Sequence, residues 1–298
     1  MTQRLDGLTL GGTLQRTLRE EVAVLRSRGI LPVLAEIMIS GNHASGKYAS
    51  QSMRACENIG AESWICRLPK DSTPETLSSE IFGLSVHPHV NGVLIQLPLE
   101  NLAISPPQAL REITYRSMDE IIPSRDVDGF HPTNITKFVR GQPCLPPATA
   151  KGIITLLDHY GIPLKGRDVA IIGVSEIVGR PLGNFLVNQR EATVAFCHRE
   201  TRDISFYMRN ADIVVSAIGK PHYFNADVIK EGAVVIDVGM NRVIDPTSSK
   251  GYRFVGDFDD SIWGKASHAT PVPGGVGPMT VATLMQNLVQ ATKNQNPN

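Results

Sequence analysis

The stretch Val169-Ala-Ile-Ile-Gly173-Val-Ser-Glu-Ile-Val-Gly179-Arg-Pro181 decides the fold of this chain. A short run of apolar, mainly β-branched residues leads into a glycine, a short loop, a second glycine and a helical pattern, which is the order strand, turn, helix. A helix N-terminus beside a glycine-lined loop offers backbone N–H groups and a positive dipole end, which favour a phosphate. The two glycines stand six residues apart, whereas the usual dinucleotide fingerprint is G-x-G-x-x-G. The spacing alone is a weak signal, so the stretch is also compatible with a βαβ turn that binds no ligand.

Helical and strand patterns alternate on both sides of this stretch. Before it, residues 13–28, 47–59 and 73–84 have helical periodicity, and residues 32–40, 63–68 and 92–95 have strand character. After it, strands are predicted at 192–197, 213–217 and 234–238, and a closing helix at 279–292. This alternation predicts an α/β fold with a mainly parallel sheet.

The composition gives no support for non-specific binding to nucleic acid or to an anionic membrane. The 298 residues are enough for two domains of ordinary size, and 42% of them are hydrophobic. Lys and Arg number 29, as do Asp and Glu, so binding to nucleic acid or to an anionic membrane has no electrostatic support.

The four cysteines are widely spaced and fit no zinc motif, which indicates reduced thiols. We see no apolar leader and no run of membrane-spanning length, and therefore expect a cytoplasmic protein.

Two stretches of the first half combine polar residues with a position suited to a ligand. Tyr48 and Ser52 are four residues apart and so project from one face of a predicted helix, although a half-buried structural tyrosine explains the pattern as well. Gln96 ends a buried strand, at the edge where open parallel sheets bind ligands. An amide that bonds only its own loop is the alternative for Gln96.

Two loops are also candidates. Asp126 and Asp128 flank Val127, and acids at alternate positions bind a metal or the donor edge of a ligand, or belong to a plain turn. The loop 270–278 contains three prolines and three glycines, which let the backbone approach a flat ligand closely or serve only as a hinge. The sequence alone does not choose between these alternatives.

Taken in this order, these pieces resemble the bifunctional methylenetetrahydrofolate dehydrogenase/methenyltetrahydrofolate cyclohydrolase family. The resemblance runs from about residue 32 to the closing helix. Its most specific motifs are Gln96-Leu-Pro-Leu99, Asp126-Val-Asp-Gly-Phe-His-Pro132, Gly173-x-Ser-x-Ile-Val-Gly-Arg-Pro181, Asp237-Val-Gly-Met-Asn-Arg242 and Thr270-Pro-Val-Pro-Gly-Gly-Val-Gly-Pro-Met-Thr280.

The resemblance implies two α/β domains around a cleft, the second a Rossmann-like, doubly wound, mainly parallel sheet. Residues 1–148 with 278–298 would form a folate-binding catalytic domain, and residues 149–277 an NAD(P)-binding domain. The substrate would be a tetrahydrofolate derivative and the cofactor NADP or NAD, with no metal. The family is usually homodimeric through the nucleotide domain, so a homodimer is expected.

The resemblance also assigns site residues by position. Tyr48 would stack on the folate, Gln96 would support catalysis and Asp128 would hold the pterin edge, and with Ser52 these are the catalytic candidates. Further substrate contacts are expected from Leu97, Pro98, Gly274, Gly275 and Pro278. The cofactor is expected to contact Thr149, Gly173, Val174, Ser175, Ile177, Val178, His198, Arg199, Ala217, Gly219, Gly239 and Thr280.

One departure from the family concerns hydrolysis. The family carries a lysine four residues after the tyrosine, where this chain has Ser52, and no lysine occurs between Tyr48 and Lys70. A lysine of lowered pKa can move the protons that hydrolysis of the methenyl group needs, whereas a serine hydroxyl does not titrate near neutral pH. Hydride removal mainly needs orientation. We therefore expect a site without a titrating group, in which hydrolysis is impaired more than hydride transfer.

A second departure leaves the choice of dinucleotide open. The family often has an arginine after the first glycine, where it meets the 2′-phosphate of NADP, and this chain has Val174. Arg199 reaches the same phosphate from the next strand or is simply solvated. Two rivals to a dehydrogenase also stay open: a non-catalytic folate- or nucleotide-binding paralogue, and a relative acting on another one-carbon adduct.

Overall fold

The chain divides into two compact units, each assembled from separate segments. The structure, a computed structural model, describes residues 1–40, 43–97, 99, 102 and 107–297, with the backbone alone for 43–48 and 107. Unit 1 contains Met1–Gly12, Val139–Gly141 and Thr149–Thr280. Unit 2 contains Thr13–Phe138, Gln142–Ala148 and Val281–Asn298.

The bounds of these compact units differ from the domain bounds expected from the sequence. We expected residues 1–12 in the same domain as the helix that follows them, but they belong to unit 1. The reason is strand β1 (Gln3–Arg4), which pairs in parallel with β11 (His268–Ala269) at the end of the unit 1 sheet. Residues 278–280 likewise belong to unit 1 and not to the unit that contains the rest of the closing helix.

Unit 2 is built on a three-stranded parallel sheet in the order β3 (Glu62–Leu68), β2 (Val33–Ile39), β4 (Gly92–Ile95). Every residue of the central strand β2 is buried. A parallel strand is buried on both faces when helices cover both, so it is expected to be almost continuously apolar. In β2 the exception is Glu36.

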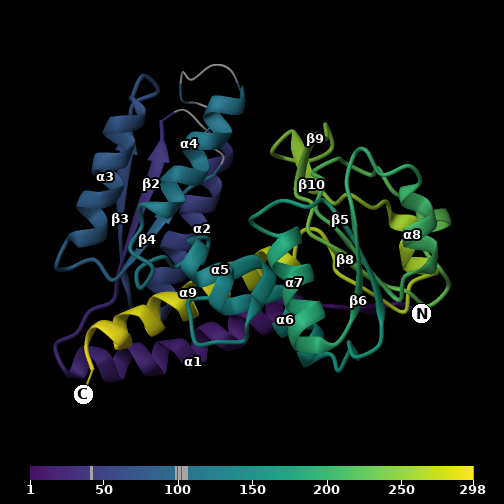
Figure 1. Cartoon of the computed structure of the whole chain (residues 1–298), viewed down its shortest axis with the longest axis horizontal. Helices are drawn as coiled ribbons and strands as arrows, with labels where there is room; N and C mark the ends of the chain where they lie inside the picture. The colour runs from purple at the N-terminus through teal and green to yellow at the C-terminus, as the bar shows by residue number, and fades with distance from the viewer. Residues whose placement is uncertain (41–42, 98, 100–101, 103–106, 298) are drawn as a thin grey trace. The chain divides into compact units, whose positions relative to one another are not determined.

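Helices lie on both sides of this sheet (Figure 1), and each face has its own hydrophobic core. On one face, Ala35 and Ile37 of β2 pack with Leu77 and Ile81 of helix α3 (Pro74–Val86). On the other face, Leu34 packs with residues of three further helices. These helices are α1 (Gly7–Ser27), α2 (His43–Ile59) and α9 (Val276–Gln295).

Unit 1 is built on a six-stranded sheet in the order β1-β11-β8-β7-β5-β6, in which every neighbouring pair is parallel. Strand β5 is followed in sequence by β6 on one side, while β7 and β8 extend the sheet on the other side. The strand order therefore reverses between β5 and β7, and ligands of open α/β sheets bind at the carboxyl edge at such a point. The bounds are β5 (Asp168–Ile172), β6 (Thr193–Cys197), β7 (Ile213–Ser216) and β8 (Val234–Asp237).

The remaining elements connect these sheets. They are α4 (Pro107–Asp119), α5 (Pro132–Val139), α6 (Ala148–His159), α7 (Gly179–Arg190), α8 (Ile204–Asn210), the short 3₁₀ helices η1 (Ala226–Val228) and η2 (Asp260–Gly264), and the antiparallel pair β9 (Asn241–Ile244) and β10 (Tyr252–Val255). Across the described ranges, none of the helices has the length and apolar character needed to cross a membrane. All four cysteines are free thiols.

Candidate functional site

A carboxyl group occupies a core position of unit 2 where the strand pattern calls for an apolar side chain. Side chains alternate between the two faces of a strand, so Glu36 shares the face of Leu34, the face packed against α1, α2 and α9. Leu94 is its register partner on β4. The Glu36 side chain has no exposed surface at all. Sequence analysis did not select this residue, although a single acid within Val33-Leu-Ala-Glu-Ile-Met-Ile39 was a visible signal.

Glu36 joins two residues that the sequence did select. Its Oε2 accepts hydrogen bonds from Ser52 Oγ at 2.7 Å and from Gln96 Nε2 at 2.6 Å. Ser52 Oγ is also 3.0 Å from the carbonyl oxygen of Ala49, so its one proton serves two acceptors. Ser52 and Gln96 are both buried. Among the side chains that the structure describes, the second oxygen of Glu36, Oε1, is buried and has no hydrogen-bond partner.

The buried carboxyl titrates near neutral pH. Burial raises the pKa of Glu36 to about 7, and the hydrogen bonds from Ser52 and Gln96 only partly oppose this rise. This corrects the expectation of a site without a titrating group: the group exists, but it is on β2 and not at position 52. The sequence could not show this because the three partners are 16 and 60 residues apart.

Asp128 belongs to the same acidic environment. Burial, together with smaller contributions from the charges of Asp126 and Glu36, raises its pKa to about 8. Burial likewise raises the pKa of the Cys56 thiol on α2, with the charges of Glu36 and Glu57 adding to the effect. These shifts describe a cluster of acids that keep their protons to higher pH than exposed carboxyls do, and whose ionised forms a donor or a cation would stabilise.

Asp126, in contrast, has a structural role. Its carboxylate accepts hydrogen bonds from the backbone N–H groups of Gly129 and His131 at 3.0 and 2.8 Å, and from Asn134 Nδ2 at 3.0 Å. These bonds hold the turn that presents Asp128. The alternative of a metal site at the two aspartates finds no support within the described ranges, where no three His, Cys, Asp or Glu side chains are grouped to hold an ion.

The other folate candidates are placed as follows. Tyr48 lies on α2, one turn before Ser52, and its side chain is not among those described. Leu97 is half-buried and packs against the core cluster that includes β2 and α3. Pro98 lies outside the described residues. The structure thus brings together Ser52 and Gln96 around Glu36, with Asp128 close enough to be affected by its charge.

The loop 270–278 is tightly constrained and belongs to unit 1. Gly275 N–H donates to the carbonyl of Pro271 at 2.8 Å, and a Cβ added at Gly275 would lie 2.6 Å from Thr270 Cβ. Gly274 has φ +115°, a conformation that favours glycine. Pro278 lies in the first turn of α9, where proline is tolerated. These candidates therefore belong to a different unit from Ser52, Gln96 and Asp128.

The turn after β5 forms a cradle lined by backbone. Gly173 has φ +104°, and a Cβ there would lie 2.5 Å from the carbonyl oxygen of Ala217, the residue after β7. A Cβ on Gly179 would overlap the carbonyl oxygen of Gly173. Ser175 Oγ accepts a hydrogen bond from Val178 N–H at 3.2 Å, which closes the turn into α7. Gly173 and Ala217 are thus adjacent where the strand order reverses, and the bare backbone fits a dinucleotide phosphate.

Two buried aspartates fix the neighbouring loops of this edge. Asp257 accepts hydrogen bonds from Ser216 Oγ and from the backbone N–H groups of Ile218 and Lys220, at 2.8–2.9 Å. Asp237 accepts from Gly239 N–H at 2.9 Å. The candidates Gly219 and Gly239 therefore lie in loops held by these carboxylates. Sequence analysis did not select Asp257, because its partners come from distant segments.

The remaining cofactor candidates differ in environment. Thr280 Oγ1 donates to Thr149 Oγ1 at 3.2 Å, so these two are brought together. His198 follows β6, and its N–H bonds Thr201 Oγ1 at 3.0 Å. Arg199 is almost fully exposed and forms an ion pair with Glu200 at 3.1 Å. Val174 and Ile177 are half-buried and Val178 is buried, and none of them offers a charge to a phosphate.

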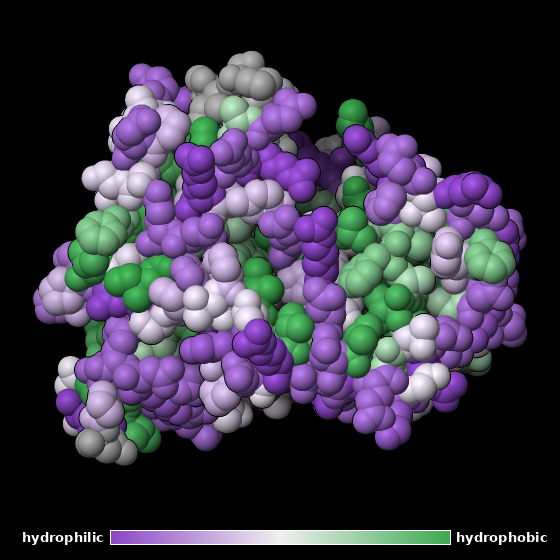
Figure 2. All heavy atoms as spheres, in the orientation of Figure 1, coloured by the Kyte–Doolittle hydropathy of each residue, from purple (hydrophilic) through white to green (hydrophobic). Residues whose placement is uncertain are grey.

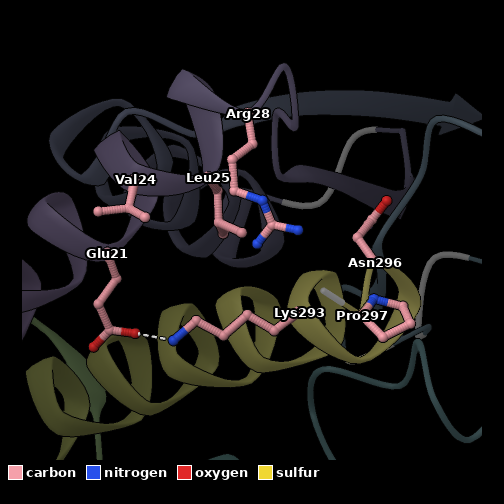
Figure 3. A pocket seen from close by; sticks show the side chains of 7 residues that line it. All are labelled: Glu21, Val24, Leu25, Arg28, Lys293, Asn296 and Pro297. Carbon is pink, nitrogen blue, oxygen red and sulfur yellow. Dashed lines mark hydrogen bonds and ion pairs between the residues drawn. The ribbon is translucent and has the colours of Figure 1, made fainter.

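A surface pocket of about 450 Å³ lies between α1 and the end of α9 (Figure 3). Lys293 of α9 reaches across to Glu21 of α1 in an ion pair of 2.6 Å. None of the predicted site residues lines this pocket, so we assign the reaction to the residues around Glu36 and not to this surface.

Comparison with known proteins agrees with the resemblance noted from the sequence. Residues 5–128 match the model of the tetrahydrofolate dehydrogenase/cyclohydrolase catalytic domain, and residues 147–296 match the model of its NAD(P)-binding domain. The bifunctional protein FolD of Nautilia profundicola is 41% identical over 291 residues, which cover 97% of each chain.

Solved structures of such enzymes have the same fold over the whole chain. The bifunctional FolD dehydrogenase/cyclohydrolase of Campylobacter jejuni is 38% identical, with a TM-score of 0.89, and the match covers 99% of this chain and 100% of that one. The Trypanosoma brucei FolD, solved with NADP and an inhibitor, is 33% identical, with a TM-score of 0.91 and coverage of 100% and 99%. The chain therefore belongs to the tetrahydrofolate dehydrogenase/cyclohydrolase family of enzymes.

Proposed function

We propose that this enzyme oxidises 5,10-methylenetetrahydrofolate to 5,10-methenyltetrahydrofolate with NADP or NAD, and that its hydrolysis of the product to 10-formyltetrahydrofolate is weak or absent. Family membership supports the dehydrogenase, and so does the dinucleotide cradle at Gly173. We place the reaction in the cytoplasm, because the chain has the neutral charge balance and free thiols expected there.

The observation that carries the weak hydrolysis is the hydrogen bond from Ser52 to Glu36. The residue at the position where the family has a lysine is Ser52, whose neutral hydroxyl donates a hydrogen bond to the buried carboxyl of Glu36. Hydrolysis requires a group that takes a proton from the attacking water and later gives one to a nitrogen of the adduct. Glu36 is fully buried, and Ser52 and Gln96 both donate to its Oε2. A water would therefore have to act through Ser52 or Gln96, neither of which titrates near neutral pH.

The remaining residues of the site bind and orient. Asp128, whose raised pKa shows that its charge is poorly compensated, would accept hydrogen bonds from the N–H donor edge of the pterin. Tyr48 would stack on the folate and Gln96 would hold the reacting carbon in place. The dinucleotide, held at Gly173, Ser175 and the N-terminus of α7, supplies the hydride acceptor.

The test is a comparison of the two activities in the purified protein. Reduced nicotinamide is followed by absorbance with methylenetetrahydrofolate and either NADP or NAD, and hydrolysis is followed as loss of the methenyl chromophore. We expect hydride transfer with at least one dinucleotide, and hydrolysis slower by about 10²–10⁴-fold than general acid–base catalysis would allow. Fast hydrolysis with slow hydride transfer would contradict the proposal. No turnover with either dinucleotide would favour a non-catalytic paralogue or a different one-carbon adduct.

We also propose that the protein is a homodimer that pairs through unit 1. Support comes from the edge strand β6 and helix α8, where Phe196, Phe206 and Tyr207 are 38%, 58% and 41% exposed. Hydrophobic side chains gather on this face between α7 and α8, around a hollow of about 150 Å³ (Figure 2). Exposed apolar patches and open sheet edges are typical of association surfaces. Light scattering after size exclusion would give the mass, and Phe206→Glu should convert a dimer into a monomer.

A further inference from the structure

We propose that Glu36 is the counter-ion of the folate site: its carboxylate stabilises the positive charge that the substrate acquires when hydride leaves. The inference rests on the proposed hydride transfer and deepens it. It assigns an electrostatic role to a residue on β2 that the family resemblance did not select.

The first argument is that the carboxyl of Glu36 has no cation beside it among the described side chains. None of the ion pairs between described residues involves Glu36. Its Oε1 is buried and has no hydrogen-bond partner among the described atoms, although leaving a buried polar group unsatisfied is costly. Lys47 is the single lysine of α2, and its side chain lies outside the described atoms. A buried acid in this state is stabilised most by a ligand that brings a positive charge.

The second argument comes from the reaction itself. A C–H bond of the methylene carbon breaks, and its electron pair leaves with the hydrogen as hydride to the oxidised nicotinamide. The carbon is left with a positive charge that it shares with the two nitrogens beside it, and no proton moves. The reaction therefore needs no base. A fixed negative charge that already exists before the hydride leaves would lower the barrier.

The third argument is the orientation of Gln96. An ionised carboxylate only accepts hydrogen bonds, so the group of Gln96 that faces Glu36 is its NH₂, at 2.6 Å. The carbonyl oxygen of the amide, its negative end, therefore points away from Glu36. Glu36 thus acts as a positioning residue for Gln96 as well as a source of charge.

The same charge would disfavour hydrolysis. Stabilising the methenyl cation makes it a weaker electrophile toward water, whereas the family's lysine would have the opposite charge at this place. Among the described side chains, the charge of Glu36 affects the pKa of Asp128 and of the Cys56 thiol, and neither group supplies a positive charge. Glu36 and Asp128 both ionise near neutral pH, Glu36 at the lower pH, so the effect of the Glu36 charge should appear as pH rises through about 7.

The test compares wild type with Glu36→Gln, Glu36→Asp and the control Glu57→Gln, an exposed acid on α2. Two quantities are measured from about pH 6 to about pH 8, around the pKa of about 7. One is kcat for hydride transfer. The other is the dissociation constant of methenyltetrahydrofolate, whose bridged ring system carries a positive charge, beside that of tetrahydrofolate, whose ring system is uncharged; the carboxylates of the glutamate tail are common to both.

For wild type we expect kcat to rise with pH through this range. Glu36→Gln should lose the rise, have about tenfold lower kcat at the upper end, and bind the cation about tenfold more weakly while its affinity for tetrahydrofolate is unchanged. Glu36→Asp should keep the rise, because it keeps the charge, and Glu57→Gln should behave as wild type.

Three results would overturn the inference. If the rise of kcat with pH persists in Glu36→Gln, the titrating group is Asp128. If both folates lose affinity equally in Glu36→Gln, the role of Glu36 is only structural. If Glu36→Gln loses hydrolysis and keeps hydride transfer, Glu36 is a base. Failure of the proposed function is distinguishable, because wild type would then transfer no hydride with either dinucleotide. In that case the two dissociation constants still decide whether Glu36 recognises a cation.

Discussion

Ser52 Oγ lies 2.7 Å from Oε2 of Glu36 in the core of unit 2. The residue at the position where the resemblance places a lysine is therefore hydrogen-bonded to the one acid of an otherwise apolar strand. A lysine and a carboxylate at these two places would form an ion pair, whereas the serine leaves the carboxylate charge uncompensated. The two positions should be changed together in any attempt to interconvert the activities.

The first prediction is that Ser52→Lys raises hydrolysis of methenyltetrahydrofolate by at least about tenfold, because it restores a titrating amine at the site. The amine would also pair with Glu36 and neutralise its effect on the cation, so hydride transfer should slow. The measurement is loss of the methenyl chromophore beside the rate of nicotinamide reduction. Ser50→Lys, exposed on the same helix, is the control. No gain in hydrolysis would mean that the site differs from the hydrolytic one at further positions.

The second prediction concerns stability and pH. Glu36 has a folded-state pKa of about 7, raised from 4.5 by burial, so between these values the folded state binds more protons than the unfolded state. Its contribution to stability is then fully present below pH 4.5 and is lost as pH rises through 7. The free energy of unfolding of unit 2 should fall by about 3 kcal/mol over this window relative to Glu36→Gln.

Urea unfolding of both proteins at the two ends of the window measures this difference. The chain has two tryptophans, Trp64 in unit 2 and Trp263 in unit 1, so a Trp263→Phe background makes the fluorescence specific for unit 2. Asp128 also has a raised pKa, to which the charge of Glu36 contributes, so both proteins are compared in an Asp128→Asn background that removes its titration. Equal pH dependence in the two proteins would show that Glu36 does not titrate in this range.

The third prediction compares two glycines that both have positive φ, of which Gly173 is in a tightly packed turn and Gly161 is not. Gly173 and Gly161 both have positive φ, +104° and +66°, but an added Cβ would meet the carbonyl of Ala217 at 2.5 Å in the first case and nothing within 4 Å in the second. Gly161→Ala should cost about 1 kcal/mol of strain. Gly173→Ala should lower the melting temperature further and weaken dinucleotide binding by more than tenfold, as calorimetry and fluorescence titration would show. Equal losses in both variants would mean that the cradle tolerates a side chain.

The fourth prediction concerns the choice of dinucleotide. Val174 carries no charge, and Arg199 follows β6 with its guanidinium almost fully exposed and paired only with Glu200 at the surface. Arg199→Ala should raise KM for NADP by about tenfold, the loss of one charge-assisted contact, and leave KM for NAD unchanged. Arg202→Ala, another exposed arginine in the same loop, is the control. Unchanged KM for both dinucleotides would show that Arg199 is only solvated.

Much of the fold was predictable because the strands of both sheets are short, apolar and bounded by turn residues. The strand at Gly92–Ile95 was predicted to the residue, and β2, β3 and β5–β8 agree within one or two residues. The closing helix begins at Val276, three residues before its predicted start, because proline is compatible with the first turn of a helix. The two-residue strand β1 is too short to have a pattern of its own.

The candidate site was only partly predictable. The motifs selected Ser52, Gln96 and Asp128 individually, since each stands at a helix face, a strand end or a turn. Glu36 was missed because an acid within a strand has meaning only when its partners are known. Those partners come from α2 and from the end of β4, and no periodicity links them to β2. The three hydrogen bonds that Asp126 accepts depend on the folded turn, so its structural role was not visible in the sequence.

The assignment of residues Met1–Gly12 to unit 1 has a consequence for synthesis of the chain. Unit 1 needs segments from the first twelve residues and from as far as Thr280, and unit 2 closes only with residues 281–298. Neither unit can be completed while the ribosome is still translating the middle of the message. This protein therefore cannot fold one domain at a time from the N-terminus, which is the usual order for a two-domain chain. Unit 1 can be completed only after Thr280 has left the exit tunnel, and unit 2 only after residues 281–298 have followed it.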